Sequence, residues 1–394
     1  MKKRLLLFAA SCLFSVLLAE AVLRIYNPFP GRVRGDQIVL GRNVQFVYSG
    51  PGNGKFESQI VYSTNSLGLR GPEPPADFSS QTTIITVGGS TTECRYLSDD
   101  KTWPAHLGRL LRESHPNVWV NNAGLDGHST FGHTVLLEDH VLKLRPTFML
   151  FLVGWNDVGV SASRVYDRAQ FAWKDGSLRQ LLLSAANYSE VLTLGLIVQR
   201  SREAWLRGMR HGMDFDIRKQ PVFRMAEEDV AALCGYHSAT FIPGYEQRLR
   251  GLLVMSRQAG SEPVLLTQPT LCAVGVDEAT GFDFGVVRAE PDMNCHALWR
   301  LLETYNDATR RVGRETGTKV IDLAQQLPRD EAYFYDMAHF AVPGAAAVGE
   351  IVANSMAAEL ASRRGVSSGN RRPSARSPKK STPNGDTTRR SLTE

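Results

Sequence analysis

The chain has 394 residues, of which 43% are hydrophobic and 22% charged, which is an ordinary globular composition with room for one large domain or two modest ones. Its formal net charge of +5 arises from segment 362–394, where nine basic residues stand against two acidic ones and leave the rest slightly acidic. Composition therefore argues against a nucleic-acid partner, because the folded part keeps no excess of basic residues for a phosphate-binding face.

The N-terminus has the form of an export segment, with Met1-Lys2-Lys3-Arg4 followed by an apolar run over 5–19. Ala19-Glu20-Ala21 has the small-x-small shape of a cleavage site, whereas extending the apolar run to residue 23 gives a membrane anchor. Segment 1–25 is thus a signal anchor or a signal peptide. Either way, the basic head places the remainder outside the cytoplasm, in the periplasm or at the cell surface.

Short apolar runs rich in β-branched residues alternate with stretches of helical period, and this alternation predicts a three-layer α/β sandwich with a central parallel sheet over 81–361. Segment 30–80 is expected to be an N-terminal extension of short strands and turns. Segment 160–235 is expected to be a largely helical insertion that packs on the body, with a lid over the site as the alternative. Strands are predicted at 82–87, 118–121, 147–153, 263–267 and 319–323, and helices at 103–113, 132–144, 244–259, 297–316 and 344–361.

The first predicted strand ends in Gly88-Gly89-Ser90. Two glycines allow a sharp turn, and a serine placed there stands at the carboxyl edge of the sheet, where sites form in this fold class. A phosphate-binding loop would have a similar position, but the segment has no P-loop lysine and no G-x-G-x-x-G pattern. The pattern therefore favours Ser90 as a nucleophile over a nucleotide site.

A serine nucleophile needs a base, a group that orients the base, and donors for the oxyanion. Asp336 lies three residues before His339 in a loop after the last predicted strand, so the carboxylate can meet the imidazole. Gly127 and Asn156 follow the second and third strands and can donate to an oxyanion together with the Ser90 N–H. All these loops end at one sheet edge.

No cofactor or metal is expected, because the cysteines lack C-x-x-C spacing and no histidine pair accompanies them. An exported chain permits disulfides. Cys272 and Cys295 bracket a polar excursion and are the first candidates for a pair, with Cys234 as a competing partner. Segment 362–394, rich in Ser, Pro, Arg and Lys, is expected to be a disordered tail that is either solvated or attached to an anionic surface.

The combined blocks resemble the SGNH (GDSL-like) hydrolases over about residues 82–361, and the N-terminal segment, extension and insertion resemble its membrane-anchored bacterial members. Gly89 stands where the family name leads one to expect Asp, so the resemblance does not assign a well-studied subfamily. The matching blocks are Gly88-Gly89-Ser90, Gly127, Gly154-x-Asn156-Asp157 and Asp336-x-x-His339.

The resemblance implies a flavodoxin-like SGNH fold in which Ser90, His339 and Asp336 are catalytic and Ser90, Gly127 and Asn156 form the oxyanion hole. It implies an extracytoplasmic serine esterase acting on small acyl esters, with O-acetyl groups on carbohydrate as the substrate by family analogy. Two alternatives stay open. One is an O-acyltransferase for a cell-surface polysaccharide, and the other is a catalytically silent binding protein at the cell surface.

Overall fold

The centre of the molecule is a parallel sheet of five strands in the order β6-β5-β7-β8-β11. The structure is a computed structural model that describes residues 2–26, 33–34, 37–161, 178–206, 213–272 and 281–369. Numbered along the sheet's own strands, this is the flavodoxin-like order 2-1-3-4-5, as predicted, and its switch point lies between β5 and β7. The strands are β5 (Thr82–Gly88), β6 (Val118–Asn122), β7 (Phe148–Leu152), β8 (Glu262–Leu266) and β11 (Lys319–Ile321).

Helices cover both faces of the sheet, which gives the predicted three layers. Because side chains alternate along a strand, Ile84 packs toward one helical layer and its neighbour Ile85 toward the other, and both are fully buried. The first layer holds α3 (Trp103–Ser114) and α12 (Val342–Gly369), and the second holds α4 (Thr130–Leu136), α9 (Ile242–Gln258) and α10 (Cys295–Thr316).

Two predicted helices differ from the observed ones by more than two residues at one end. The helix expected at 132–144 is divided into α4, a π-helical turn η3 (Leu137–Val141) and a short α5 (Leu142–Leu144). Helix α12 runs to Gly369, past the predicted end at 361, because the arginines at 363 and 364 that indicated a tail are also good helix formers. Residues 370–394 of the predicted tail lie outside the described residues.

The N-terminal extension forms two small antiparallel pairs, β1 (Val33–Arg34) with β2 (Gln37–Ile38) and β3 (Gln45–Ser49) with β4 (Gln59–Ser63). Further along, the Arg70 and Asn122 backbones exchange two hydrogen bonds of 2.9 and 3.0 Å. This bridge covers part of the open edge of β6. The extension is therefore joined to the sheet beside the strand ends.

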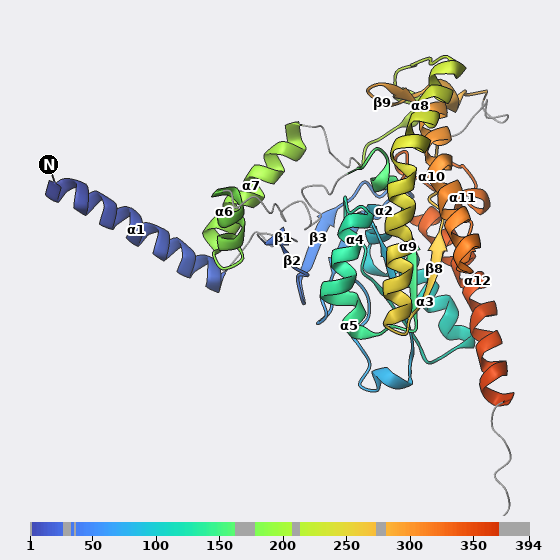
Figure 1. Cartoon of the computed structure of the whole chain (residues 1–394), viewed down its shortest axis with the longest axis horizontal. Helices are drawn as coiled ribbons and strands as arrows, with labels where there is room; N and C mark the ends of the chain where they lie inside the picture. Colours follow the sequence, from blue (N-terminus) through green and yellow to red (C-terminus); the bar gives the residue numbers. More distant parts are fainter. Residues whose placement is uncertain are drawn as a thin grey trace, which may run out of the picture.

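The expectation that the helical insertion packs on the body is wrong for its first part. Helix α7 (Glu190–Leu206) lies against α1 (Lys2–Ile25) and against α6 (Leu178–Ala186), away from the sheet (Figure 1). Hydrogen bonds hold α7 beside α1, because the Glu20 carboxylate of α1 accepts from the N–H groups at the start of α7. Helix α8 (Glu227–Thr240) does pack on the body, against α9 and α10.

The cysteine pairing left open by the sequence is Cys272 with Cys295, joined in a disulfide. This bond ties the segment after β8 to the start of α10. Cys234, the competing candidate, is free and half-buried on α8, and Cys94 is free and buried.

Candidate active site

Ser90, His339 and Asp336 form a hydrogen-bonded chain at the carboxyl edge of the sheet. Ser90 begins the single-turn helix α2 (Ser90–Glu93) after β5, and the other two residues lie in the loop before α12. The Ser90 hydroxyl lies 2.7 Å from His339 Nε2, and His339 Nδ1 lies 2.7 Å from Asp336 Oδ2. The structure thus brings together three residues that the sequence had placed on two loops.

The electrostatics of Asp336 fix the direction of these bonds. Burial alone would raise its pKa, but His339 and the backbone N–H groups of Ala338 and His339 outweigh burial and hold the pKa below its usual range. The carboxylate is therefore ionised and can only accept. His339 Nδ1 accordingly donates to Asp336, and the lone pair of Nε2 faces the Ser90 hydroxyl, whose proton it can accept.

Tyr335 is a neighbour of the site that the sequence reasoning missed. Its ring stacks on the His339 ring with centroids 5.3 Å apart and planes inclined by 9°, and its N–H donates to the His339 carbonyl. Burial, reinforced by nearby Asp336, raises the Tyr335 pKa well above its ordinary value, so the phenol is neutral. The stacked ring holds the imidazole plane, and nothing in the sequence distinguished it from an ordinary core tyrosine.

Gly89 has a specific reason to be glycine. A Cβ built at this position would lie 2.2 Å from the Asn156 amide nitrogen. The missing side chain is thus what lets Asn156, in the turn η4 (Trp155–Asp157) after β7, approach the residue next to Ser90. An aspartate here would displace that amide. Gly88 is equally constrained, since its Cβ would meet the Leu152 carbonyl at 2.5 Å.

Gly127 lies in the loop after β6, which runs beside the nucleophile turn. Its φ of +75° falls in the left-handed region that favours glycine. Nearby, the Leu125 N–H donates to the Gly88 carbonyl at 3.0 Å, and the His128 carbonyl lies 3.4 Å from the position of a Gly89 Cβ. The loops that carry Gly127 and Asn156 therefore both border Gly88 and Gly89.

A buried ionic network connects those two loops. The Asp157 carboxylate accepts from the Thr130 N–H at 3.1 Å and from its hydroxyl at 2.5 Å, and Arg248 of α9 lies 3.4 Å from the same carboxylate. Burial raises the Asp157 pKa, while the Thr130 and Arg248 contacts act against that rise. Asp157 was part of a matching block, but only the structure reveals its partners, Thr130 and Arg248.

Arg70 of the extension is structural. It is 5% exposed, forms an ion pair with Asp99 at 2.7 Å, and donates to the carbonyls of Glu93 and Cys94 at 2.7 and 2.6 Å. Those carbonyls belong to the end of α2, so the extension fixes the turn that presents Ser90 without Arg70 entering the hydrogen-bonded chain.

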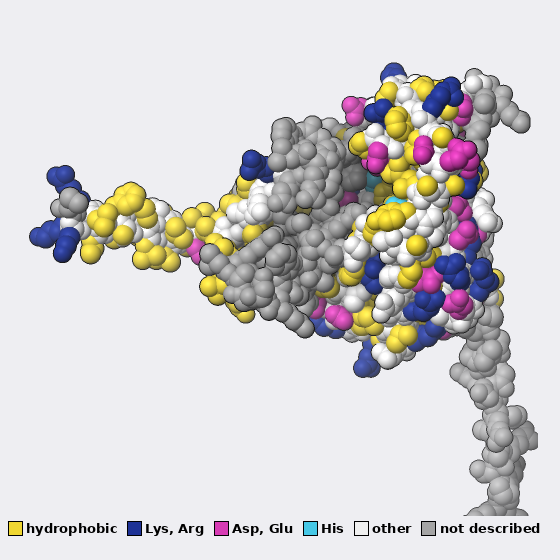
Figure 2. All heavy atoms as spheres, turned by 45° about the horizontal axis from the view of Figure 1, so that its top comes forward, with side chains coloured by type: hydrophobic (Ala, Val, Ile, Leu, Met, Phe, Trp, Pro, Cys, Tyr) yellow, Lys and Arg dark blue, Asp and Glu magenta, His cyan; other side chains and the backbone are white. Residues whose placement is uncertain are grey.

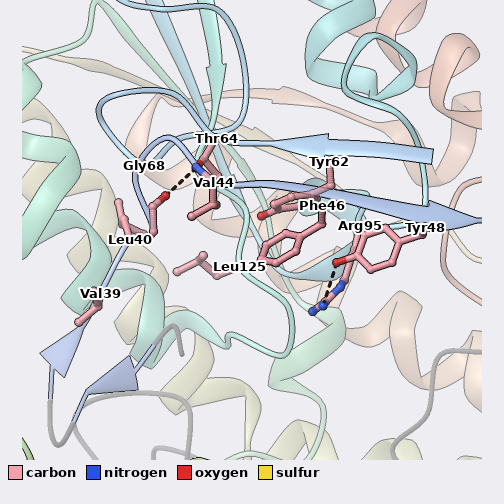
Figure 3. Close-up of a pocket in the computed structure, with 11 residues that line it drawn as sticks. Val39, Leu40, Val44, Phe46, Tyr48, Tyr62, Thr64, Gly68, Arg95 and Leu125 are labelled. Carbon is pink, nitrogen blue, oxygen red and sulfur yellow. Dashed lines mark hydrogen bonds between the residues drawn. The ribbon is translucent and has the colours of Figure 1, made fainter. Parts of the chain in front are cut away.

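A groove of about 100 Å³ adjoins these loops (Figure 3). Phe46 and Tyr48 project into it from alternate positions of β3, Val44 lines it from just before that strand, and the groove continues to Leu125 in the loop that carries Gly127. The Arg95 guanidinium donates to the Tyr48 hydroxyl at 3.2 Å. The Arg95 cation thus lines an aromatic groove, and the Asp126 carboxylate is the nearby opposite charge that acts on it.

Comparisons with known proteins found similar solved structures. Among solved structures, an acetylxylan esterase from Geobacillus stearothermophilus is 14% identical with a TM-score of 0.37, the alignment covering 69% of this chain and 92% of the other. The acetyl xylan esterase AlAXEase is 12% identical with a TM-score of 0.39, covering 69% and 98%. A GDSL-like lipase from Bacteroides thetaiotaomicron is 8% identical with a TM-score of 0.37, covering 74% and 93%.

No curated protein matches the chain. The model of the GDSL-like lipase/acylhydrolase family matches residues 86–347, which is more than half of the sequence and includes both Ser90 and His339. The chain belongs to the GDSL-like lipase/acylhydrolase family and is an ester-hydrolysing serine hydrolase.

Proposed function

We propose that the protein is an extracytoplasmic serine esterase that removes small acyl groups through Ser90, His339 and Asp336. The observation that carries this proposal is the continuous chain of two 2.7 Å contacts from the Ser90 hydroxyl to the Asp336 carboxylate. Geometry of this kind supplies a general base in bonding distance of the nucleophile and an ionised group that orients the base.

In the acylation step, the Ser90 oxygen attacks the ester carbonyl while His339 Nε2 takes the hydroxyl proton. Negative charge then develops on the carbonyl oxygen, and the Ser90 N–H, the Gly127 N–H and the Asn156 amide are the proposed donors to it. Asp336 stabilises the imidazolium without taking its proton. When the tetrahedral intermediate collapses, His339 returns the proton to the departing alcohol oxygen, and the acyl group stays on Ser90.

In the second step, water attacks the acyl-enzyme, and His339 takes a proton from the water as its oxygen bonds to the acyl carbon. The Ser90 oxygen leaves with that proton, and the carboxylic acid is released. A sugar hydroxyl in place of water would transfer the acyl group instead. This is why hydrolase and O-acyltransferase use the same residues.

The groove beside β3 supports carbohydrate as the alcohol part of the ester. Phe46 and Tyr48 line the groove and stack on each other, and sugar rings pack their C–H faces on aromatic side chains. Arg95 adds a cationic hydrogen-bond donor at the same place, which suits a sugar that carries a carboxylate or many hydroxyls. Because Arg95 follows α2 and Leu125 precedes Gly127, a bound sugar would lie beside the reacting serine.

The extracytoplasmic location is supported by α1, which is long and apolar enough to cross a membrane, a property that signal sequences share. Three of its four basic residues, Lys2, Lys3 and Arg4, lie at the N-terminal end, and this bias supports an outer location for the esterase body.

The test compares the wild type with Ser90→Ala and His339→Ala on p-nitrophenyl acetate, p-nitrophenyl butyrate and acetylated xylo-oligosaccharides. We expect each substitution to lower kcat/KM by at least about 10³-fold, because each removes part of a unit that acts together. Ser114→Ala and His296→Ala, outside the site, serve as matched controls and should retain activity. Full activity in Ser90→Ala would refute the assignment, and acyl transfer to added free sugar in preference to water would identify an acyltransferase.

A further inference from the structure

An acidic residue within the apolar helix α1 calls for an explanation. Glu20 lies near the C-terminal end of a helix whose other side chains are largely apolar and exposed, including Leu13 and Leu17 at 61% and 59%. A carboxylate surrounded by lipid is costly unless its oxygens are satisfied by partners within the protein. The partners of Glu20 therefore indicate what surrounds this end of α1.

The Glu20 carboxylate binds the N-terminus of α7. It accepts from the Ser189 hydroxyl at 2.9 Å, from the Glu190 N–H at 3.1 Å and from the Val191 N–H at 3.2 Å. An anion at this position satisfies the free N–H groups of a first helical turn and interacts favourably with the helix dipole. Arg24, one turn further along α1, bonds to Glu20 at 2.8 Å and completes its neutralisation.

Helices α6 and α7 form a hairpin that presents apolar side chains to the outside. The Thr193 hydroxyl donates to the Ala186 carbonyl at 2.7 Å across the turn, which holds the two helices together. Leu181 on α6 is 67% exposed and Val198 on α7 is 60% exposed, although both belong to largely apolar stretches. A helix pair that folds in water alone would cover such side chains.

The exposed apolar side chains of the hairpin continue those of α1. Figure 2 shows the hydrophobic side chains of α1 running from its basic tip toward the insertion. With 24 residues α1 is about 36 Å long, enough for a hydrocarbon layer of about 30 Å. Glu20 then lies near the outer boundary of that layer, and Tyr188, 78% exposed at the hairpin turn, lies at the depth where tyrosine is enriched.

We propose that α6 and α7 lie in the outer boundary of the lipid bilayer, docked on α1 through Glu20, and that α1 is retained as an anchor. The proposal rests on the extracytoplasmic location proposed above. It commits to lipid as the occupant because the apolar faces of the hairpin are continuous with a helix of membrane-spanning length. Cleavage at Ala19-Glu20-Ala21 would remove the carboxylate's helix from α7, so retention and docking belong together.

The experiment places a diazirine-bearing amino acid at one position at a time in the full-length protein, reconstituted in vesicles of phosphatidylcholine and phosphatidylglycerol. Leu182 on α6, 47% exposed, and Val198 test the hairpin, Leu13 tests the anchor, and Val254 on α9, 51% exposed, is the matched control on the body. We expect lipid adducts at 13, 182 and 198 and none at 254. Glu20→Ala should reduce the adducts at 182 and 198 severalfold and leave those at 13 unchanged.

The outcomes test the docking of the hairpin and the membrane anchor separately. Adducts at 13 without adducts at 182 and 198, or crosslinks from 182 and 198 to a second copy of the chain, would refute lipid docking and leave the anchor intact. No adduct at 13 would refute the membrane anchor itself, as would loss of the first residues in the intact mass of the protein. The same labelling in a Ser90→Ala background separates these results from the esterase assignment, because crosslinking needs no catalysis.

Discussion

The sheet body buries its apolar side chains, whereas the group formed by α1, α6 and α7 leaves many of them exposed. Phe148 and Phe151 in β7 are fully buried, whereas Leu5 in α1 and Leu181 in α6 are 74% and 67% exposed. The body satisfies its hydrophobic surface internally and holds its polar groups in a dense network at the strand ends. The second group is held together by polar contacts around Glu20, and its apolar side chains remain exposed.

The same division separates the residues proposed for catalysis from those proposed for substrate contact and location. Every residue proposed to act on the carbonyl group or on the proton that moves lies in the body, within the match to the family at 86–347. In the proposals made above, the β3–β4 hairpin contacts the alcohol part of the ester, and α1 with α6 and α7 determines location. If this division is right, substitutions in the body should change chemistry for every ester, and substitutions outside it should change selectivity or placement.

The largest effect that tests this division is expected from Asn156→Ala. Loss of one oxyanion donor should lower kcat by about 10²–10³-fold, and to the same extent for p-nitrophenyl acetate and for acetylated sugars. Asn117→Ala, at an exposed position just before β6, is the matched control and should be neutral. Steady-state kinetics on both substrates provide the measurement. Wild-type kcat in Asn156→Ala would remove Asn156 from the oxyanion hole.

A smaller and more selective effect is expected from Phe46→Ala in β3. Loss of the ring from the groove should lower kcat/KM for acetylated sugars by about tenfold, equivalent to about 1.4 kcal/mol. Activity on p-nitrophenyl acetate should not change, because that substrate has no sugar to contact the groove. Val47→Ala is the matched control, since Val47 is 57% exposed and points to the other face of the strand. Equal losses on both substrates would mean that the extension supports catalysis itself.

The sequence predicted the body well and its surroundings poorly, for physical reasons. Buried strands and amphipathic helices carry periodic apolar patterns, and the carboxyl ends of parallel strands share an edge, so Ser90 and His339 could be placed together before any coordinates. The stacking of Tyr335 on His339 and the bonds between Asp157, Thr130 and Arg248 have no such pattern. The stacking depends on how the loop that contains 335–339 folds back on itself, and the Asp157 bonds depend on contacts between segments far apart in the chain.

The position of the insertion could not be predicted from the sequence either. An amphipathic helix has an apolar face whatever covers it, so periodicity could not distinguish packing on the sheet from packing beside α1. What decides is the pairing of Glu20 with the start of α7, a contact between residues about 170 positions apart. The Cys272–Cys295 disulfide, by contrast, was favoured by its position around a short polar excursion.

The smallest effect that tests the body concerns pH. His133 on α4 is 1% exposed beside Gly89 and Asn156, and burial lowers its pKa to about 3. In the unfolded chain an imidazole takes up a proton near pH 6.5. Between these values the unfolded state binds more protons than the folded state, so the free energy of unfolding should fall as pH decreases from about 6.5 toward 3.

His133→Leu should remove this part of the pH dependence. Its Nδ1 has no hydrogen-bond partner among the described residues, so leucine loses no polar contact there. From urea unfolding at pH 8 and pH 5, we expect the wild type to lose up to about 2 kcal/mol more stability on acidification than the variant does. His296→Gln, at a partly exposed position on α10, should behave as the wild type. Equal acid losses in wild type and His133→Leu would mean that His133 is protonated in place. The surroundings of Gly89 and Asn156 would then be polar enough to hold a charged imidazole. The contrast between a body that buries its side chains away from water and the exposed group of α1, α6 and α7 would not hold next to the site.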